Sequence, residues 1–304
     1  MSLAVLIPTF RRPEGVARAL RSVLIQSRLP DEIIVVDNDP AASARQTVSA
    51  IAADAPVPVV HVHEPRPGVA NARNAGFAAT GAELIAQLDD DEEAAPDWLS
   101  ALLAARGALG AQIVFGPVTA AAHDDGAVRR AFMRRLYSRG GAEVDVLLDD
   151  TWGCGNSLID RGALDLPDPP FHPATNETGG EDDQLFTALR RQGCRFGWAA
   201  QAHVTEHVEG RRARWRYLLA RSFAYGQGAS QNCVHEGRTD WAGAGFWMAV
   251  GAGQLAVYGL ALPVALLAGA ERGAACLDRA VQGAGKLVWA ESLGPRFYGA
   301  SAPA

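Results

Sequence analysis

Four consecutive acids, Asp89-Asp90-Asp91-Glu92, are the most chemically informative stretch of the chain. They follow residues 83–88, an apolar run that predicts a short buried strand. Four anions at the end of one strand repel each other unless a cation lies among them. Carboxylate oxygens suit Mg²⁺ or Mn²⁺, which typically bridge a few carboxylates to substrate phosphates. A solvated acidic turn leading into a helix near Pro96 would explain the same residues, because acids favour the first turn of a helix.

A second acidic group, Glu181-Asp182-Asp183, follows two glycines and opens a helix that the pattern predicts over 182–192. The glycines permit a close approach of the backbone. The apolar face of this helix consists of Leu185, Phe186 and Leu189. The alternative interpretation is complementation of the helix dipole, with Thr178 or Asp182 as the cap.

The elements that must position these acids alternate between strand and helix over the first hundred residues. We predict strands at 3–7, 32–36, 57–62 and 83–88. Helices are predicted at 13–26 and 69–79, and a loop and a further helix follow the second strand and end near residue 53. This alternation predicts an α/β fold with a mostly parallel sheet and helices on both faces. Ligands of such sheets bind beyond the carboxyl ends of the strands, so residues 8–12, 37–39 and 89–92 should lie along one rim. Further strands are expected at 112–115, 157–159 and 195–198.

The last third of the chain changes in character. Several arginines between residues 211 and 221 form a basic helical stretch, and no charged residue occurs between Trp241 and Ala270. That run exceeds the ~20 apolar residues needed to cross a bilayer. Because glycines and Pro263 interrupt it, a kinked span, a re-entrant hairpin, an interfacial helix pair and a buried hairpin of a soluble domain all fit. If the segment spans the bilayer, the arginines before it place its amino-terminal side in the cytosol.

Composition restricts the class of protein. The 304 residues carry a formal net charge of −6, which argues against general nucleic-acid binding because a polyanion needs a basic face. The four cysteines are widely spaced and form no CxxC pair, which indicates reduced thiols rather than a zinc site. The amino terminus reads as a strand and not as a signal segment, so the catalytic part is expected in the cytosol.

Five stations along the chain together carry a family resemblance. They are Ile7–Arg12, Val36-Asp37-Asn38, Gly68–Gly76, Leu88–Glu92 and Gly180–Asp183. In this order they resemble the inverting glycosyltransferases of family 2, which have the GT-A fold. The resemblance implies a catalytic domain over 1–210, with a nucleotide-sugar-binding half (1–110) and an acceptor-binding half (111–210). The remainder, 211–304, resembles the membrane-associated helical tail of bacterial polysaccharide-assembly members, with its apolar segment at 241–270.

The resemblance also assigns donor-side roles. Asp37 would accept a hydrogen bond from a pyrimidine NH, and Arg73 would lie near the base and the phosphates. Asp89 would hold the ribose, and Asp91 would hold the metal that neutralises the diphosphate. The other residues expected to bind the nucleotide sugar are Pro8, Thr9, Arg11 and Asp90.

On the acceptor side, Asp182 would be the general base, because a sugar hydroxyl is a poor nucleophile until its proton is taken. Glu181 would position the acceptor, and Asp183 is the alternative base. Trp152, as a stacking platform or else a core residue, and Asn156 belong to a segment that resembles the acceptor-binding region.

The resemblance places His207 where some members have a histidine at the metal or diphosphate. His203 and His207 have the spacing of neighbours on one helical face.

The sequence thus predicts a metal-dependent transferase that moves a sugar, with a UDP-sugar as the expected donor, to a glycan or lipid-linked acceptor at the cytosolic membrane face. A divalent metal, Mg²⁺ or Mn²⁺, would stabilise the leaving diphosphate. One alternative is a nucleotidyltransferase that makes sugar nucleotides, although the chain has no Gly- and Lys/Arg-rich phosphate loop after its first strand. A catalytically silent membrane scaffold of the same fold is the other.

Overall fold

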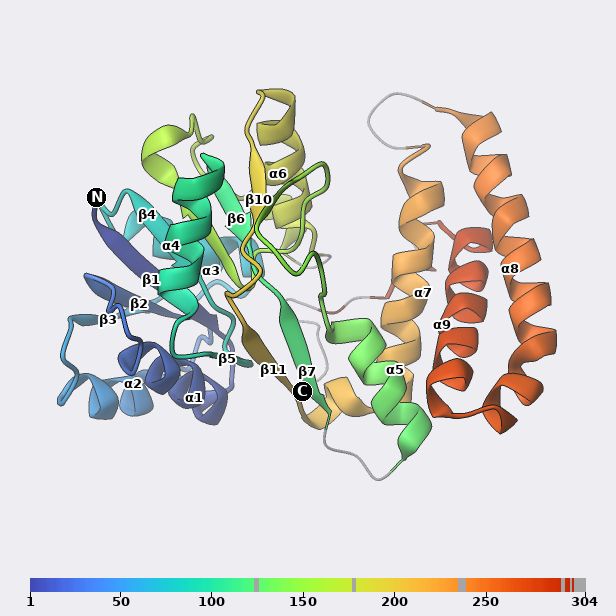
Figure 1. Cartoon of the computed structure of the whole chain (residues 1–304), viewed down its shortest axis with the longest axis horizontal. Helices are drawn as coiled ribbons and strands as arrows, with labels where there is room; N and C mark the ends of the chain where they lie inside the picture. Colours follow the sequence, from blue (N-terminus) through green and yellow to red (C-terminus); the bar gives the residue numbers. More distant parts are fainter. Residues whose placement is uncertain (123–125, 177–178, 235–238, 291–292, 296, 298–304) are drawn as a thin grey trace. The chain divides into compact units, whose positions relative to one another are not determined.

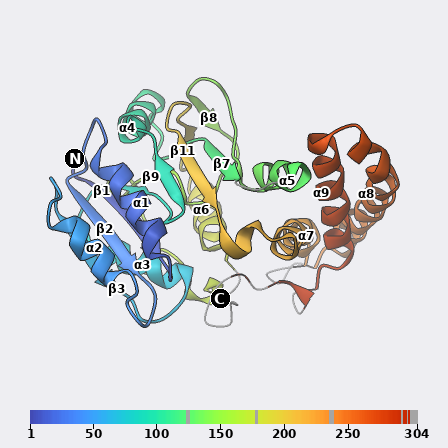
Figure 2. The same ribbon diagram turned by 90° about the horizontal axis from the view of Figure 1, so that it is seen from below.

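An eight-stranded mixed sheet organises the first two thirds of the chain (Figures 1 and 2). The computed structural model describes residues 1–122, 126–176, 179–234, 239–290, 293–295 and 297. The strand order is β3-β2-β1-β4-β9-β6-β10-β8, and β8 and β9 run antiparallel to their neighbours. The strands are β1 (Leu3–Thr9), β2 (Glu32–Asp37), β3 (Val59–His63), β4 (Leu84–Gln87), β6 (Ile113–Phe115), β8 (Val146–Leu148), β9 (Ser157–Asp160) and β10 (Phe196–Trp198).

Helices cover both faces of this sheet. One apolar core contains side chains of α1 (Pro13–Leu24), α2 (Arg45–Ala52) and α4 (Trp98–Leu109). A second core contains side chains of α3 (Val69–Ala78) and α6 (Glu181–Arg191). Strand β1 supplies Leu3, Val5 and Ile7 to the first core and Leu6 to the second, because successive side chains of a strand point to opposite faces. The predicted α/β architecture with a mostly parallel sheet is confirmed.

Four strands were not expected, namely β8 in the main sheet and three that form a sheet of their own. Strands β5 (Glu92–Ala94), β7 (Val118–Ala122) and β11 (Val204–Val208) form a second sheet in the order β5-β11-β7. The helical spacing of His203 and His207 was therefore misleading, because His207 lies in a strand. Glutamate is depleted in strands, so β5 gives little sequence signal, and its pairing with β11 supplies the missing stabilisation.

The chain divides into two compact units. The larger unit contains Met1–Thr119 and Arg139–His207, and the smaller contains Ala120–Ser138 and most of the chain after His207. The division after His207 lies close to residue 210, where the sequence suggested a boundary. Residues 120–138, which the sequence assigned to the acceptor-binding half, belong to the smaller unit.

The smaller unit is helical. Its helices are α5 (Ala127–Tyr137), α7 (Trp215–Gln231), α8 (Trp241–Leu267) and α9 (Ala270–Leu287), and Figure 2 shows α9 between α8 and the pair α5 and α7. Its core includes Phe132 and Trp215, whose rings meet edge to face with centroids 5.4 Å apart. Paired glycines bring α8 and α9 together, since a Cβ built on Gly251 would lie 2.7 Å from the Gly283 carbonyl oxygen.

Helix α8 is the apolar segment singled out from the sequence. It is one unbroken helix of 27 residues with Pro263 inside it, so a re-entrant hairpin within 241–267 is not what forms. It is long and apolar enough to cross a membrane, with a mean hydropathy of 1.7, and 6% of its most apolar window is buried. The alternative of a buried hairpin of a soluble domain does not fit, because most of α8 is exposed.

Candidate active site

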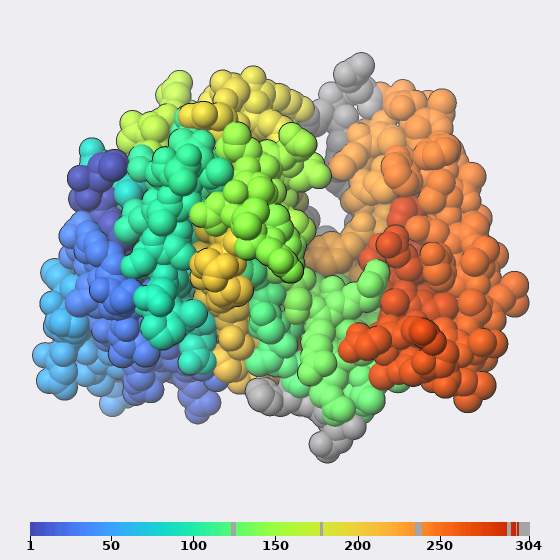
Figure 3. Space-filling view, in the orientation of Figure 1, coloured from blue at the N-terminus to red at the C-terminus, as the bar shows by residue number. Residues whose placement is uncertain are grey.

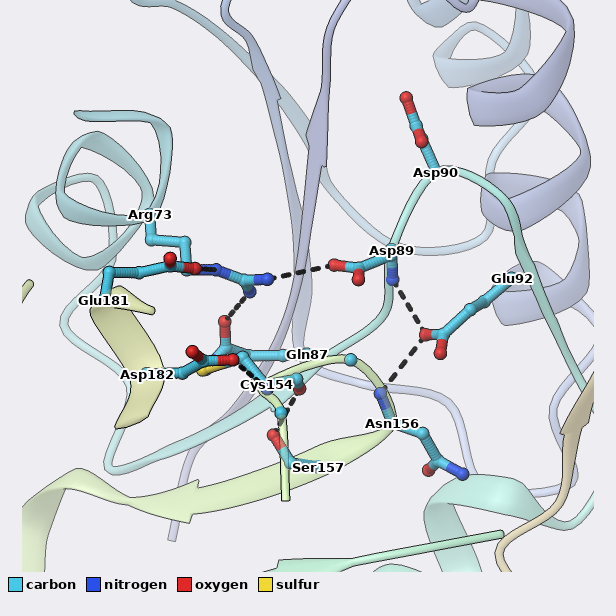
Figure 4. A network of polar contacts seen from close by, with 12 residues as sticks. Arg73, Gln87, Asp89, Asp90, Glu92, Cys154, Asn156, Ser157, Glu181 and Asp182 are labelled. Atoms are coloured by element: carbon cyan, nitrogen blue, oxygen red, sulfur yellow. Dashed lines mark hydrogen bonds and ion pairs between the residues drawn. The ribbon is translucent and has the colours of Figure 1, made fainter. Parts of the chain in front are cut away.

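The two acidic clusters lie at ends of elements that the main sheet brings together. Residues 89–92 follow β4, and Glu181 and Asp182 begin α6 on the face covered by α3. A third segment, residues 152–156, leads into β9, which pairs with β4. Figure 4 shows side chains from all three segments facing one another.

Arg73 on α3 connects the two clusters. Its Nε lies 3.1 Å from Glu181 Oε1, and its Nη2 lies 3.2 Å from Asp89 Oδ1. Its Nη1 donates to Gln87 Oε1 at 2.5 Å, so the guanidinium points between the clusters (Figure 4). The side chain is buried. Burial alone would lower the pKa of Arg73, but the acidic groups around it raise that pKa well above its ordinary value. Arg73 is thus a fixed cation, and the sequence-based expectation that it contacts the nucleotide stays a prediction.

Glu181 is a buried carboxyl with an unusual proton affinity. Burial, followed by the nearby charge of Asp182, raises the pKa of Glu181 to about 7, although the ion pair with Arg73 opposes this. The neighbouring Cys154 thiol is also buried, which raises the pKa of that thiol well above its ordinary value. Cys154 is therefore a neutral thiol at neutral pH.

The Asp182 carboxylate accepts hydrogen bonds from two backbone NH groups. Its Oδ2 accepts from Cys154 N at 3.0 Å, and its Oδ1 accepts from Asp183 N at 2.9 Å. The side chain is partly exposed, whereas Glu181 is buried and Asp183 is exposed. Asp182 therefore combines a fixed carboxylate with access from solvent. Helix α6 begins after Gly180 without a side-chain cap, so Asp182 is not the cap, and Thr178 lies outside the described residues.

The segment 153–156 passes between the acidic clusters. Cys154 N donates to Asp182 on one side, and Asn156 N donates to Glu92 Oε2 at 3.2 Å on the other. A Cβ on Gly155 would lie 2.8 Å from Asp89 Oδ2 and 3.0 Å from Glu92 Oε1. Only glycine permits this approach, so the backbone here sets the spacing between the acids.

Glu92 is buried beneath the acidic turn. Its Oε2 also accepts from Asp89 N at 2.9 Å. Burial, and next the charge of Asp89, raise the pKa of Glu92 to about 8. Burial also lowers the pKa of the nearby Arg139, whose Nη2 donates to the Gly155 and Asn156 carbonyls at 2.7 and 3.0 Å. Glu92 shapes the turn that presents Asp89.

Asp90 joins the loop after β4 to the loop after β1. Its Oδ2 accepts from Thr9 Oγ1 at 2.8 Å, and its Oδ1 accepts from Arg12 Nη1 at 2.9 Å. The side chain points away from the Arg73 network (Figure 4). Both Thr9 and Asp90 are buried. They hold these two loops together, and their expected contact with the donor stays a prediction.

Asp37 is fully buried, and its expected contact with a base stays a prediction. Its Oδ2 accepts from Ala44 N at 2.7 Å, and its Oδ1 accepts from Asp39 N at 3.2 Å. These bonds shape the loop after β2. Arg11 is exposed at the same rim, and its Nε lies 3.2 Å from Asp39 Oδ1, while Pro8 is partly buried at the end of β1. Arg11 and Pro8 stay predictions as donor contacts.

Of the two acceptor-side residues, Trp152 is exposed and Asn156 is not. Trp152 is 38% exposed, its ring centroid lies 6.4 Å from that of Trp198, and the Arg139 guanidinium lies 6.0 Å from the Trp152 centroid, so stacking on an acceptor sugar stays a prediction. Asn156 is fully buried. Its Oδ1 accepts from Trp98 Nε1 at 2.7 Å, and its Nδ2 donates to the Pro117 and Ala202 carbonyls at 2.8 Å each. Its polar side-chain atoms support the loop from inside the protein, and its expected contact with an acceptor stays a prediction.

The donor set of the acidic turn fits a hard divalent cation that takes most of its ligands from elsewhere. Among the described residues, no three or more His, Cys, Asp or Glu side chains converge on one point. Mg²⁺ commonly needs only one or two carboxylates besides substrate phosphates and water. Asp91 Oδ2 lies 2.7 Å from Arg12 Nη1, so an ion at this oxygen would share it with a guanidinium. The partly exposed Asp89 is the second available carboxylate.

His207 lies beside Asp91 through its backbone, since His207 N donates to the Asp91 carbonyl at 2.7 Å. Its ring Nε2, however, lies 2.8 Å from Glu93 Oε2. Its expected role as a metal ligand stays a prediction.

Several site residues were missed from the sequence. Arg12 was placed on the rim with residues 8–11 but given no role, Arg139 was not distinguished from an ordinary surface arginine, and Gln87 reads as part of an apolar strand. The sequence predicted a divalent metal among the acids. In the described chain Arg12 and Arg73 contact them, and the metal stays a prediction.

The site combines an α/β sheet with two groups of acids, residues 89–92 and the pair Glu181 and Asp182, which the buried Arg73 joins. This arrangement fits a group-transfer enzyme of the GT-A class. A family model described as "Glycosyl transferase family 2" matches residues 4–165. The chain is 33% identical over 223 residues to "Succinoglycan biosynthesis protein ExoM" of Rhizobium meliloti (strain 1021), covering 72% of this chain and 71% of ExoM. It is 34% identical over 107 residues to ExoO, another succinoglycan biosynthesis protein of that organism, covering 35% of this chain and 30% of ExoO.

Solved structures agree on the fold. S. aureus TarS matches 80% of this chain and 42% of the TarS chain, with 16% identity and a TM-score of 0.50. TarS 1–349 in complex with UDP-GlcNAc matches 80% of this chain and 70% of that chain, with 16% identity and a TM-score of 0.52. The chain belongs to glycosyltransferase family 2, and its relatives include polysaccharide-biosynthesis proteins. The predicted family and fold are confirmed, and a nucleotidyltransferase is not the class that this family indicates.

Proposed function

We propose that this glycosyltransferase moves a sugar from a nucleoside diphosphate sugar to a hydroxyl of a glycan or lipid-linked acceptor, with inversion at the anomeric carbon. The observation that carries the proposal is the fixed, partly exposed carboxylate of Asp182. A single positioned carboxylate is what a direct displacement needs. The acids of residues 89–92 lie across the segment 153–156 from it, which supports a site with the base on one side and the donor on the other.

In this mechanism Asp182 removes the proton of the acceptor hydroxyl as the new C–O bond forms. Arg73 holds Glu181 beside it, which orients the acceptor side and ties it to Asp89. Trp152 offers a stacking face for a sugar ring. When bound at Asp89 and Asp91, Mg²⁺ or Mn²⁺ would neutralise charge on the departing diphosphate. We take a UDP-sugar as the donor, because the solved TarS complex of this fold contains UDP-GlcNAc.

The proposal also places the enzyme at the cytosolic face of the membrane, supported by the apolar helix α8 and by relatives in polysaccharide biosynthesis. A lipid-linked or growing polysaccharide acceptor would be met there.

The test compares Asp182→Asn with Asp183→Asn. Asp182→Asn should retain donor affinity, measured by calorimetry, and lose transfer by about 10²–10⁴-fold, the usual contribution of a general base. Asp183→Asn, an exposed neighbour on the same helix, should retain most of its transfer activity. Transfer by Asp182→Asn at the wild-type rate would reject Asp182 as the base. Wild-type protein that neither binds nor hydrolyses any donor would favour a catalytically silent scaffold.

A further inference from the structure

The outer face of α8 is a continuous apolar surface. Its large exposed side chains are Phe246, Val257, Leu260, Val264 and Leu267, with exposed fractions of 61, 62, 83, 69 and 91%. No charged residue occurs in the helix, and at 1.5 Å per residue its 27 residues extend for about 40 Å. Figure 3 shows the α8 surface (orange) uncovered along the edge of the smaller unit in that view. An exposed apolar surface of this extent marks an interaction site.

The inner face of α8 packs against α9 from one end to the other. Near the turn, a Cβ on Gly273 would lie 2.6 Å from Leu266 Cδ2. Further along, Cys276 Sγ lies 3.0 Å from the Tyr258 carbonyl oxygen, followed by the close contact of Gly283 with Gly251. At the other end, the Trp241 and Trp289 ring centroids are 6.4 Å apart. The two helices therefore form one antiparallel hairpin along nearly the whole of α8.

The other side of α9 is bound by charged groups to α5 and α7. Asp278 is buried, and its carboxylate contacts Arg135 Nε of α5 at 2.6 Å and Ser222 Oγ of α7 at 2.7 Å. At the turn between α8 and α9, Glu271 lies 3.9 Å from Arg134 of α5, and both side chains are mostly exposed. Helix α5 also contains Arg129 and Arg130.

This packing is incompatible with α8 crossing a bilayer. A spanning α8 would carry α9 into the hydrocarbon beside it, together with the buried Asp278 and its arginine partner. The exposed Glu271 and Arg134 would also have to reach the opposite side. Charged side chains inside a bilayer are costly, and those on α5 could not be withdrawn without breaking the contact with Asp278.

We propose that α8 lies in the plane of the membrane surface, inserts its outer face into one leaflet, and does not span the bilayer. We commit to lipid rather than to a second copy of the chain, because α8 carries no charged residue and exposes large apolar side chains as far as Leu267 at its end. Trp241 and Trp247 stand near one end of α8, as aromatic side chains do at membrane interfaces. On α9, the exposed Arg272 and Arg279 offer charge complementary to anionic headgroups. The inference is independent of the proposed reaction.

The first experiment measures flotation of the purified full chain with vesicles of phosphatidylcholine and phosphatidylglycerol. Leu260→Glu/Val264→Glu should lower the bound fraction at least tenfold. Val144→Glu, at an apolar position of the other unit that is 66% exposed, should bind as the wild type does. All substituted side chains are exposed, so circular dichroism should report unchanged folding. Equal flotation of the α8 variant and the wild type would overturn the proposal, as would a wild-type chain that dimerises through α8 and ignores vesicles.

The second experiment separates lying from spanning. Thr239→Cys and Glu271→Cys place thiols at the two ends of α8, and both positions are exposed. In inverted membrane vesicles from expressing cells, a membrane-impermeant maleimide should label both sites equally before detergent is added. Labelling of Thr239→Cys alone, with Glu271→Cys reacting only after detergent, would show a span and refute the inference.

Discussion

Replacing Arg73 with methionine should destabilise the larger unit more at pH 8 than at pH 5. The guanidinium contacts two fully or nearly fully buried partners, Glu181 and Gln87, besides the partly exposed Asp89. Removing one member of a buried ion pair typically costs about 3–5 kcal/mol, because the partner charge is left uncompensated. A domain of about 150–250 residues loses about 2–4 °C in Tm per kcal/mol, so Arg73→Met should lower Tm by about 6–20 °C at pH 8.

The pH dependence follows from the pKa of Glu181, which is about 7. At pH 8 this carboxyl is ionised in the wild type, so Arg73→Met must either leave a buried anion or force the carboxyl to take up a proton, and both cost free energy. At pH 5 the carboxyl is protonated in the folded state, so Arg73→Met should lower the free energy of unfolding by less than at pH 8. Arg73→Met should also raise the pKa of Glu181 further, since Arg73 lowers it in the wild type.

Thermal unfolding followed by circular dichroism at both pH values is the assay. Arg190→Met is the matched control in the same unit, because its ion pair with Asp150 lies at the surface, with side chains that are 43 and 93% exposed. The double variant Arg73→Met/Glu181→Gln should recover part of the loss by removing the stranded charge. A cost below about 1 kcal/mol at pH 8, the value of a surface ion pair, or no recovery in the double variant, would refute this reasoning.

Three further outcomes are expected. Glu92 has a folded-state pKa of about 8 against an ordinary 4.5, so the folded chain holds a proton that the unfolded chain has lost and stability should fall as pH rises through that window. Glu92→Gln should flatten this fall in thermal unfolding, and an unchanged slope would exclude Glu92. Gly155→Ala should weaken donor binding at least about tenfold in calorimetry, because the added methyl group would push against Asp89. Gly107→Ala is the control, since Gly107 has open space around it and donor affinity should not change. Equal donor affinities of the two variants would contradict the role of Gly155 in spacing the acids. Asn156→Ala should cost at least about 2 kcal/mol in urea unfolding by orphaning buried partners such as Trp98 Nε1, and a neutral effect would return Asn156 to the acceptor side.

Local patterns in the sequence predict the first half of the sheet well. Strands β1 and β2 and helices α1 and α3 begin at or within a residue of the predicted positions, because buried parallel strands are short apolar runs between amphipathic helices. Strands β5 and β11 escape prediction because their stability comes from pairing between segments more than 100 residues apart. Helix α8 illustrates the same limit, since Gly251 looks like an interruption until α9 is seen packed against it.

The candidate site shows what a motif can and cannot predict. The motifs identified the acidic turn and the pair Glu181-Asp182, and the structure brings Asp89 and Glu181 onto one guanidinium. They did not predict which side chains of each motif are buried. Asp37 and Asn156 occupy expected positions, yet their polar atoms are used by the protein's own backbone and by Trp98. Burial of that kind depends on long-range packing, which residue type and spacing do not report.

The anomeric configuration of the transferred sugar tests the central claim most directly. If Asp182 is the one carboxylate that acts on the acceptor, the sugar is displaced in a single step. NMR of the first product formed from an α-linked donor should then show a β-linkage. An α-linked product would mean retention, and the proposed reaction with Asp182 as its base would be contradicted.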